Sequence, residues 1–145
     1  MVVTVTTELP IAAERACALA ARPATLQYVC APVVAFAPIG DAPEAVREGD
    51  VVSVRLRFLG VLPGWVHTLC VERLGEREIV SREHGGPVAA WNHRLTFVPI
   101  SATSCRYTDR VEVRAGPLTP LVAVFAHGMY RWRQARWRGL ARVLT

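Results

Sequence analysis

The sequence predicts an α+β protein in which a curved antiparallel sheet of about six to seven strands wraps around a long C-terminal helix, with two short helices after the first strand. Two observations carry this prediction. From Val51 to Ala115 apolar and polar residues alternate with a period of two, and short turn-forming segments interrupt the alternation, as in an antiparallel meander. From Thr119 onward apolar residues recur at helical spacing, and such a helix must bury its apolar side against the sheet.

The expected elements follow in order along the chain. Residues 2–8 are rich in β-branched residues and predict a strand, which Pro10 ends. Pro23 can open a second short helix after a first, alanine-rich one. Thr119 and Pro120 fit the first positions of the final helix. The expected ranges are helices at 11–21, 23–30 and 120–143, an extended segment at 33–38, and strands at 51–59, 65–74, 77–84, 88–98 and 104–115.

The final helix carries an apolar stripe that we expect to face the sheet, opposite Arg131, Arg138 and Arg142. The stripe consists of Leu121, Val124, Phe125, Gly128, Met129, Trp132, Ala135 and Leu140. Arginine and tryptophan interleave over 131–138, a pattern that also fits contact with a membrane surface or with nucleic acid. An amphipathic packing helix is the preferred interpretation.

Length and composition limit the classes of protein. With 145 residues, 52% of them hydrophobic, the chain is expected to form a single domain, 1–145, with a substantial core. The net charge of +5 is the balance of 17 arginines, with no lysine, against 12 acidic residues. The arginines are spread along the whole chain, so no nucleic-acid partner is expected. Residues 1–9 lack the pattern of a signal peptide, and no apolar run is long enough to span a bilayer. We therefore expect a cytoplasmic protein without integral membrane association.

Motifs for metal, nucleotide or nucleophilic chemistry are lacking. The four cysteines lie far apart with no CxxC pair, and the histidines show no HExxH or similar spacing. The glycines have neither GxGxxG nor Walker spacing, and no serine lies in a nucleophile elbow. No metal and no cofactor are expected.

The last predicted hairpin fixes which residues face inward. In 88–98 and in 104–115 the odd positions are apolar, apart from His93 and Asp109, while the even positions carry arginines. A turn centred near Ser101 would place Phe97 opposite Cys105, Leu95 opposite Tyr107 and His93 opposite Asp109. The inward-facing candidates are Trp91, His93, Leu95, Phe97, Tyr107, Asp109 and Val111, and the same pairing extended to earlier strands adds Ser81, Glu83 and His67.

A carboxylate on an apolar face needs a partner, so His93 and Asp109 are expected to form a hydrogen-bonded pair. Two interpretations stay open. The pair is either a satisfied buried hydrogen bond that fixes the sheet, or a functional pair that orients a polar ligand group or moves a proton.

Several segments resemble the SRPBCC superfamily, also called START-like, in its bacterial polyketide cyclase/dehydrase-like branch. The stretch 86–97 (GPVAAWNHRLTF) is similar to the GP, W, H and F pattern of that branch, and 107–112 (YTDRVE) resembles one of its strands. The resemblance covers nearly the whole chain and implies a helix-grip fold whose cavity Trp91, His93, Phe97 and Asp109 would line. The branch often has a second histidine where Leu95 stands and an acidic residue where Ser81 stands, so no proton relay through those two positions is implied.

The leading hypothesis is binding of a small hydrophobic or amphipathic molecule, lipid or polyketide-like, between the sheet and the C-terminal helix. Trp91, Leu95, Phe97, Tyr107, Val111, Met129 and Trp132 would supply the apolar contact, and His93 and Asp109 would hold one polar group. The alternative is a cyclase or dehydratase in which His93 and Asp109 transfer a proton. A third hypothesis is transient docking to a membrane surface or a partner through the arginine-rich final helix.

Overall fold

The computed structural model describes residues 1–145 and contains one seven-stranded antiparallel sheet in the order β1-β7-β6-β5-β4-β3-β2. The strands are β1 (Val2–Leu9), β2 (Val34–Pro38), β3 (Val51–Phe58), β4 (Leu62–Leu74), β5 (Glu78–Gly85), β6 (Val88–Ser101) and β7 (Ser104–Arg114). The helices are α1 (Ala13–Ala20), α2 (Pro23–Cys30) and α3 (Thr119–Val143), with a 3-10 turn, η1 (Gly116–Leu118), before α3. The expected fold class is confirmed.

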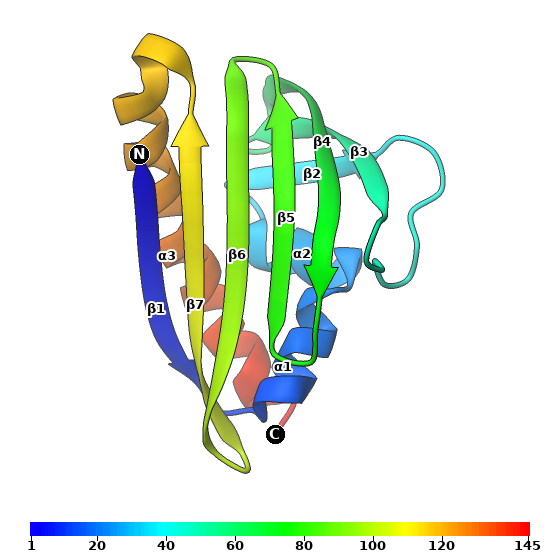
Figure 1. The fold of residues 1–145 in the computed structure, drawn as a ribbon, viewed down its shortest axis with the longest axis vertical. Helices are drawn as coiled ribbons and strands as arrows, with labels where there is room; N and C mark the ends of the chain where they lie inside the picture. Colours follow the sequence, from blue (N-terminus) through cyan, green and yellow to red (C-terminus); the bar gives the residue numbers. More distant parts are fainter.

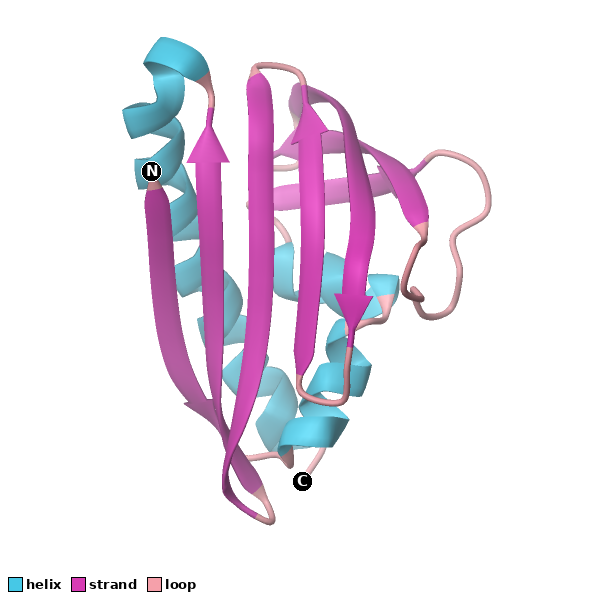
Figure 2. Cartoon of the chain, viewed as in Figure 1, coloured by secondary structure: helices cyan, strands magenta, loops and turns pink.

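All three helices lie on one face of the sheet (Figures 1 and 2). The 25-residue α3 packs against β1 and β7, while α2 lies against α3 and β2. The sheet curls so that β2 crosses behind the longer strands in this view (Figure 1). This arrangement encloses an interior between the strands from β2 to β6, α2 and the N-terminal half of α3.

The side chains of β6 and β7 that we expected to face inward do so, but the pairing of the two strands is shifted by two residues from the expected register. Phe97 pairs with Tyr107, Leu95 with Asp109, and His93 with Val111. The reason lies in the turn, because β6 continues through Pro99 to Ser101 and only residues 102 and 103 connect it to β7. Pro99 has no backbone N–H to donate and lies beside an irregularity in the pairing, where a strand tolerates proline. Since the shift is even, every side chain keeps its face.

The turn between β3 and β4 also lies earlier than expected. Pro63 and Gly64 belong to β4, and Pro63 pairs with Arg57 beside a shift of register. Only glycine fits at position 64 without a shift, because the backbone of β3 lies so close that a Cβ here would be 2.7 Å from the backbone oxygen of Leu56. The turn itself is formed by residues 59–61, with Leu59 and Gly60 at positive φ.

The buried face of α3 differs from the predicted apolar stripe. Trp132 is 42% exposed and Val124 is 73% exposed, whereas Arg133 and Gln134 are buried. The residues that face the interior are Ala123, Ala126, Met129, Tyr130, Arg133, Gln134, Trp137 and Ala141. The small alanines allow close packing on the sheet, and Gln134 hydrogen-bonds to Val5 on β1 and Asp109 on β7. No helix is long and apolar enough to cross a membrane.

Candidate functional site

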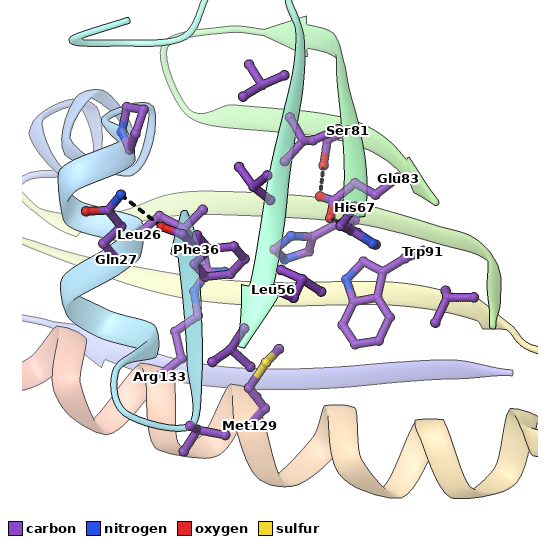
Figure 3. A pocket seen from close by; sticks show the side chains of 18 of the residues that line it. Leu26, Gln27, Phe36, Leu56, His67, Ser81, Glu83, Trp91, Met129 and Arg133 are labelled. Atoms are coloured by element: carbon purple, nitrogen blue, oxygen red, sulfur yellow. Dashed lines mark hydrogen bonds and ion pairs between the residues drawn. The ribbon is translucent and has the colours of Figure 1, made fainter. Parts of the chain in front are cut away.

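A cavity of about 740 Å³ lies between the sheet, α2 and the N-terminal half of α3. It has 34 lining residues, of which 25 are hydrophobic, and this combination of size and apolar wall is typical of small-molecule sites. The apolar wall comes from Leu26 on α2, Phe36 on β2, the inward side chains of β3 to β6, and Met129 on α3 (Figure 3).

The cavity opens between the β3–β4 turn and the first turns of α3. Exposed apolar residues that line the cavity mark this rim: Leu59 (62%), Leu62 (53%), Leu121 (69%) and Phe125 (40%). Four other exposed residues line the cavity on the side of α2, the end of β2 and the segment after it: Arg22, Gln27, Pro38 and Ala42. Phe125 also packs edge-on against Phe58, with the ring centroids 5.7 Å apart. The rim at the β3–β4 turn and α3 is therefore apolar, whereas the exposed lining near α2 includes polar Arg22 and Gln27.

One polar cluster on the sheet wall consists of Glu83, Ser81 and His67 (Figure 3). Ser81 Oγ donates to Glu83 Oε1 at 2.6 Å, and His67 Nε2 lies 3.1 Å from Glu83 Oε2. Burial alone would raise the pKa of Glu83, but the hydrogen bond from His67 and the nearby His93 and Ser81 hold it below its ordinary value. Because an ionised carboxylate only accepts, Nε2 of His67 donates, and the buried Nδ1 has no protein partner.

A second cluster is built around Asp109, which is 1% exposed. Its Oδ1 accepts hydrogen bonds from His93 Nε2 at 2.8 Å and from the Tyr107 hydroxyl at 2.7 Å. Its Oδ2 accepts from Gln134 Nε2 at 2.9 Å, and the same amide nitrogen donates to the Val5 carbonyl at 2.7 Å. The carboxylate therefore joins β6, β7, α3 and, through Gln134, β1.

The charge of Asp109 is stabilised by its surroundings. Burial alone would raise its pKa, but the positive charge of Arg133 and the hydrogen bonds from His93 and Tyr107 hold the pKa below its ordinary value. The hydrogen bond expected between His93 and Asp109 is thus present, as a diagonal contact rather than between directly opposed residues.

Arg133 extends from α3 into the cavity, apart from the Ser81–Glu83–His67 cluster (Figure 3). Its side chain is 6% exposed, and its nearest carboxylate oxygen is Asp109 Oδ1, 3.9 Å from Nη2. Its Nε is buried without a hydrogen-bond partner. Burial opposes the charge of Arg133, but Tyr107 and Asp109 raise its pKa above its already high value, so the guanidinium stays charged.

The residues predicted as site residues divide into two groups. His67, Ser81, Glu83, Trp91, His93, Leu95 and Met129 line the cavity. Phe97, Tyr107, Asp109 and Val111 are buried but do not line it, and Trp132 lies outside, donating its indole N–H to the Ala31 carbonyl at 3.0 Å. Phe97 and Tyr107 stack with centroids 4.9 Å apart, and Trp137 packs edge-on against Tyr107. Asp109 therefore lies between a hollow half of the interior and a filled half.

Several cavity-lining residues of β2, β3 and α3 were not among the expected site residues. Phe36, Leu56, Tyr130 and Arg133 line the cavity without having been predicted to do so. Tyr130 accepts a hydrogen bond from the Trp91 indole at 2.9 Å and fixes the position of that ring. The alternation of β3 contained a signal for Leu56, whereas nothing local to the sequence marked Arg133 as buried. No cluster of three or more histidine, cysteine or acidic side chains is arranged to hold a metal ion.

Comparison with known proteins places this geometry in a known fold. No family model matches the sequence, and no curated protein matches it. Among solved structures, a START superfamily protein from Mycobacterium smegmatis superposes with a TM-score of 0.76 at 17% identity, covering 99% of both chains. A Streptomyces aromatase/cyclase matches with a TM-score of 0.70 at 11% identity, covering 98% of this chain and 93% of that one.

Norcoclaurine synthase from Thalictrum flavum, solved with dopamine and hydroxybenzaldehyde, matches with a TM-score of 0.71 at 15% identity, covering 100% of this chain and 88% of that one. At these identities the likeness is one of fold, and the fold hosts both binding proteins and enzymes. The chain has the SRPBCC, or START-like, helix-grip fold.

Proposed function

We propose that the protein binds a small hydrophobic or amphipathic molecule in the cavity between the sheet and α3. The observation that carries the proposal is a mainly apolar cavity of about 740 Å³ with an apolar rim between the β3–β4 turn and α3, whose interior holds a few buried polar groups. Such a site removes an apolar ligand surface from water, which favours binding by about 25 cal/mol per Å² before the entropy of association is subtracted.

Filling the cavity tests this proposal. Val54 lines the cavity on β3, while Val51 on the same strand is 66% exposed, so Val54→Trp and Val51→Trp are matched substitutions on opposite faces. We expect the wild type to take up the neutral dye Nile red with a blue-shifted emission, Val54→Trp to weaken this binding at least about tenfold, and Val51→Trp to leave it unchanged. Equal dye binding by all three proteins contradicts the proposal.

A second candidate function is proton transfer at a carbonyl-bearing ligand, as in a cyclase or dehydratase. His93 favours it, because the ring lines the cavity and its Nε2 is held by buried Asp109, an arrangement that fixes an imidazole for acid–base work. His93→Gln keeps a hydrogen-bonding side chain but cannot take up and return a proton as an imidazole does. Hydrogen–deuterium exchange at the carbon next to the carbonyl of acetophenone, followed by NMR in D₂O, should be accelerated by the wild type and not by His93→Gln. Equal rates with the two proteins count against an acid–base role.

A further inference from the structure

Three of the four buried side-chain polar atoms without a hydrogen-bond partner belong to residues that line the cavity: Trp65 Nε1, His67 Nδ1 and Arg133 Nε. A buried polar group without a partner costs about 1–3 kcal/mol, and more when the group is charged. Arg133 is therefore the least satisfied side chain of the cavity wall.

Asp109 does not supply the hydrogen-bond acceptors that the guanidinium of Arg133 needs. The two oxygens of Asp109 already accept three hydrogen bonds, from His93, Tyr107 and Gln134. Arg133 approaches no closer than 3.9 Å, which is an ion pair without a hydrogen bond. The face of Tyr130, whose ring centroid lies 5.6 Å from the guanidinium carbon, adds a weak cation–π contact and no acceptor. The Cys30 thiol also lies beside the guanidinium, but a thiol is a weak acceptor. Arg133 Nε therefore keeps an N–H without a protein partner, on a side chain that lines the cavity.

From this geometry we infer that Arg133 recognises the carboxylate of an amphipathic ligand whose apolar body fills the rest of the cavity. The inference rests on the proposed function and specifies its ligand class. A carboxylate matches the planar fork of a guanidinium with two parallel hydrogen bonds, and these are strong where water is excluded. The apolar wall formed by residues such as Phe36, Leu56 and Met129 suits an alkyl or aromatic body.

Ionised Asp109, 3.9 Å away, already balances the charge of Arg133, so this position accepts no more than one further negative charge. The preference for an anion comes from the guanidinium N–H that has no hydrogen-bond partner. Arg133 is the buried cation, whereas Arg22, the other arginine of the lining, is 45% exposed and paired with Glu44 at 2.6 Å. Glu83 is ionised on the sheet wall, so a ligand anion is repelled from that side and attracted to the side of α2, β2 and α3. A phosphate dianion would need more positive charge than one guanidinium supplies, so a carboxylate is the better fit.

The test compares ligands that differ only in this group. Dodecanoate, methyl dodecanoate and 1-dodecanol are titrated at pH 8 against protein loaded with Nile red, and their displacement constants are measured. We expect the wild type to bind dodecanoate about 10- to 100-fold more tightly than the ester or the alcohol, the range for a hydrogen-bonded charge pair. Because this comparison uses the wild type, it stands even if a variant fails to fold.

The variants then assign the preference to one residue. Arg133→Met should reduce dodecanoate affinity by the same factor and leave methyl dodecanoate within about twofold, since only the charge-assisted bonds are lost. Arg131→Met, two residues earlier on the exposed side of α3, is the matched control and should keep the wild-type preference. Arg133→Lys should keep part of it, because lysine supplies the charge without the bidentate fork.

The outcomes separate the two proposals. Equal affinity of the wild type for the acid and the ester, or a preference that persists in Arg133→Met, overturns the role of Arg133 while the cavity remains a binding site. Failure of the wild type to take up Nile red and all three ligands overturns the binding function, and the inference falls with it.

Discussion

Replacing Asp109 by asparagine removes one negative charge from the buried network without changing the shape of the side chain. In the native protein the two carboxylate oxygens accept from His93, Tyr107 and Gln134. If the asparagine oxygen takes the place of Oδ1, its NH₂ group faces the NH₂ group of Gln134, which is committed to the Val5 carbonyl. If the amide turns, the hydroxyl proton of Tyr107 loses its acceptor. Either orientation leaves a buried donor unpaired.

The expected loss of stability is large for an isosteric change. An unpaired buried donor costs about 1–3 kcal/mol, and hydrogen bonds to a neutral oxygen contribute about 1 kcal/mol less than those to a charged one. Arg133 also loses the carboxylate 3.9 Å away. We therefore expect Asp109→Asn to lower the free energy of unfolding by about 3–5 kcal/mol, as when one partner of a buried ion pair is removed. For a chain of this size this corresponds to a fall in Tm of roughly 8–15 °C.

Urea unfolding followed by tryptophan fluorescence measures the difference, with Tm from calorimetry as a second observable. Glu112→Gln is the control, because Glu112 lies on the same strand but its side chain is 37% exposed and pairs with exposed Arg114. It should change the free energy of unfolding by no more than about 0.5 kcal/mol. If Asp109→Asn unfolds at the same urea concentration as Glu112→Gln, the Asp109 network does not hold the strands and α3 together, and our reasoning is refuted.

Two further predictions concern the sheet wall and the glycines. Glu83 and Asp109 both have pKa values below their ordinary 4.5 and 3.8, so the stability that each contributes is complete above that value and is lost as pH falls through the lowered pKa of the folded state. The free energy of unfolding should therefore decline below about pH 4.5, less steeply in Glu83→Gln than in the wild type, and equal slopes would contradict the assignment to Glu83. Gly64→Ala should destabilise by about 1–3 kcal/mol, because the new methyl group meets the Leu56 backbone, whereas Gly139→Ala in α3 meets nothing within 4 Å and should stabilise by about 0.5–1 kcal/mol. Urea unfolding of both alanine variants checks this pair, and similar values for the two would show that the approach at Gly64 is not tight.

The alternation of apolar and polar residues in β6 and β7 is sufficient to predict which side chains face inward, because only one of the two sets of alternating residues is apolar enough to be buried. It was not sufficient to predict register, since Pro99 looked like the start of a turn and instead continues β6. The hydrogen bond between His93 and Asp109 was nevertheless predicted, because an even shift keeps both side chains on one face and their length spans the diagonal.

The orientation of α3 could not be predicted from its own residues. The helical pattern predicts Trp132 in the interior and the arginines on a solvated face, yet Trp132 is 42% exposed and Arg133 and Gln134 are buried. Their burial depends on Asp109, which lies 24 and 25 positions earlier in the chain on another element, so no local window contains both partners. The orientation of α3 about its own axis determines which part of the sheet its side chains cover and which part borders the cavity. Phe97, Tyr107 and Val111 lie in the covered, filled part.

Asp109 lies between the filled and the hollow halves of the interior. Substitutions that affect the cavity and substitutions that affect the packed core therefore fall on different parts of the sheet. Side chains of β3, such as Val54 and Leu56, line the cavity, and two strands, β4 and β5, separate β3 from the β6–β7 pair that carries the stacked Phe97 and Tyr107 rings. Substitutions on that wall change what fits inside, while the scaffold keeps its anchoring elsewhere. The volume and shape of the cavity can therefore change through one wall, without compensating changes around Asp109.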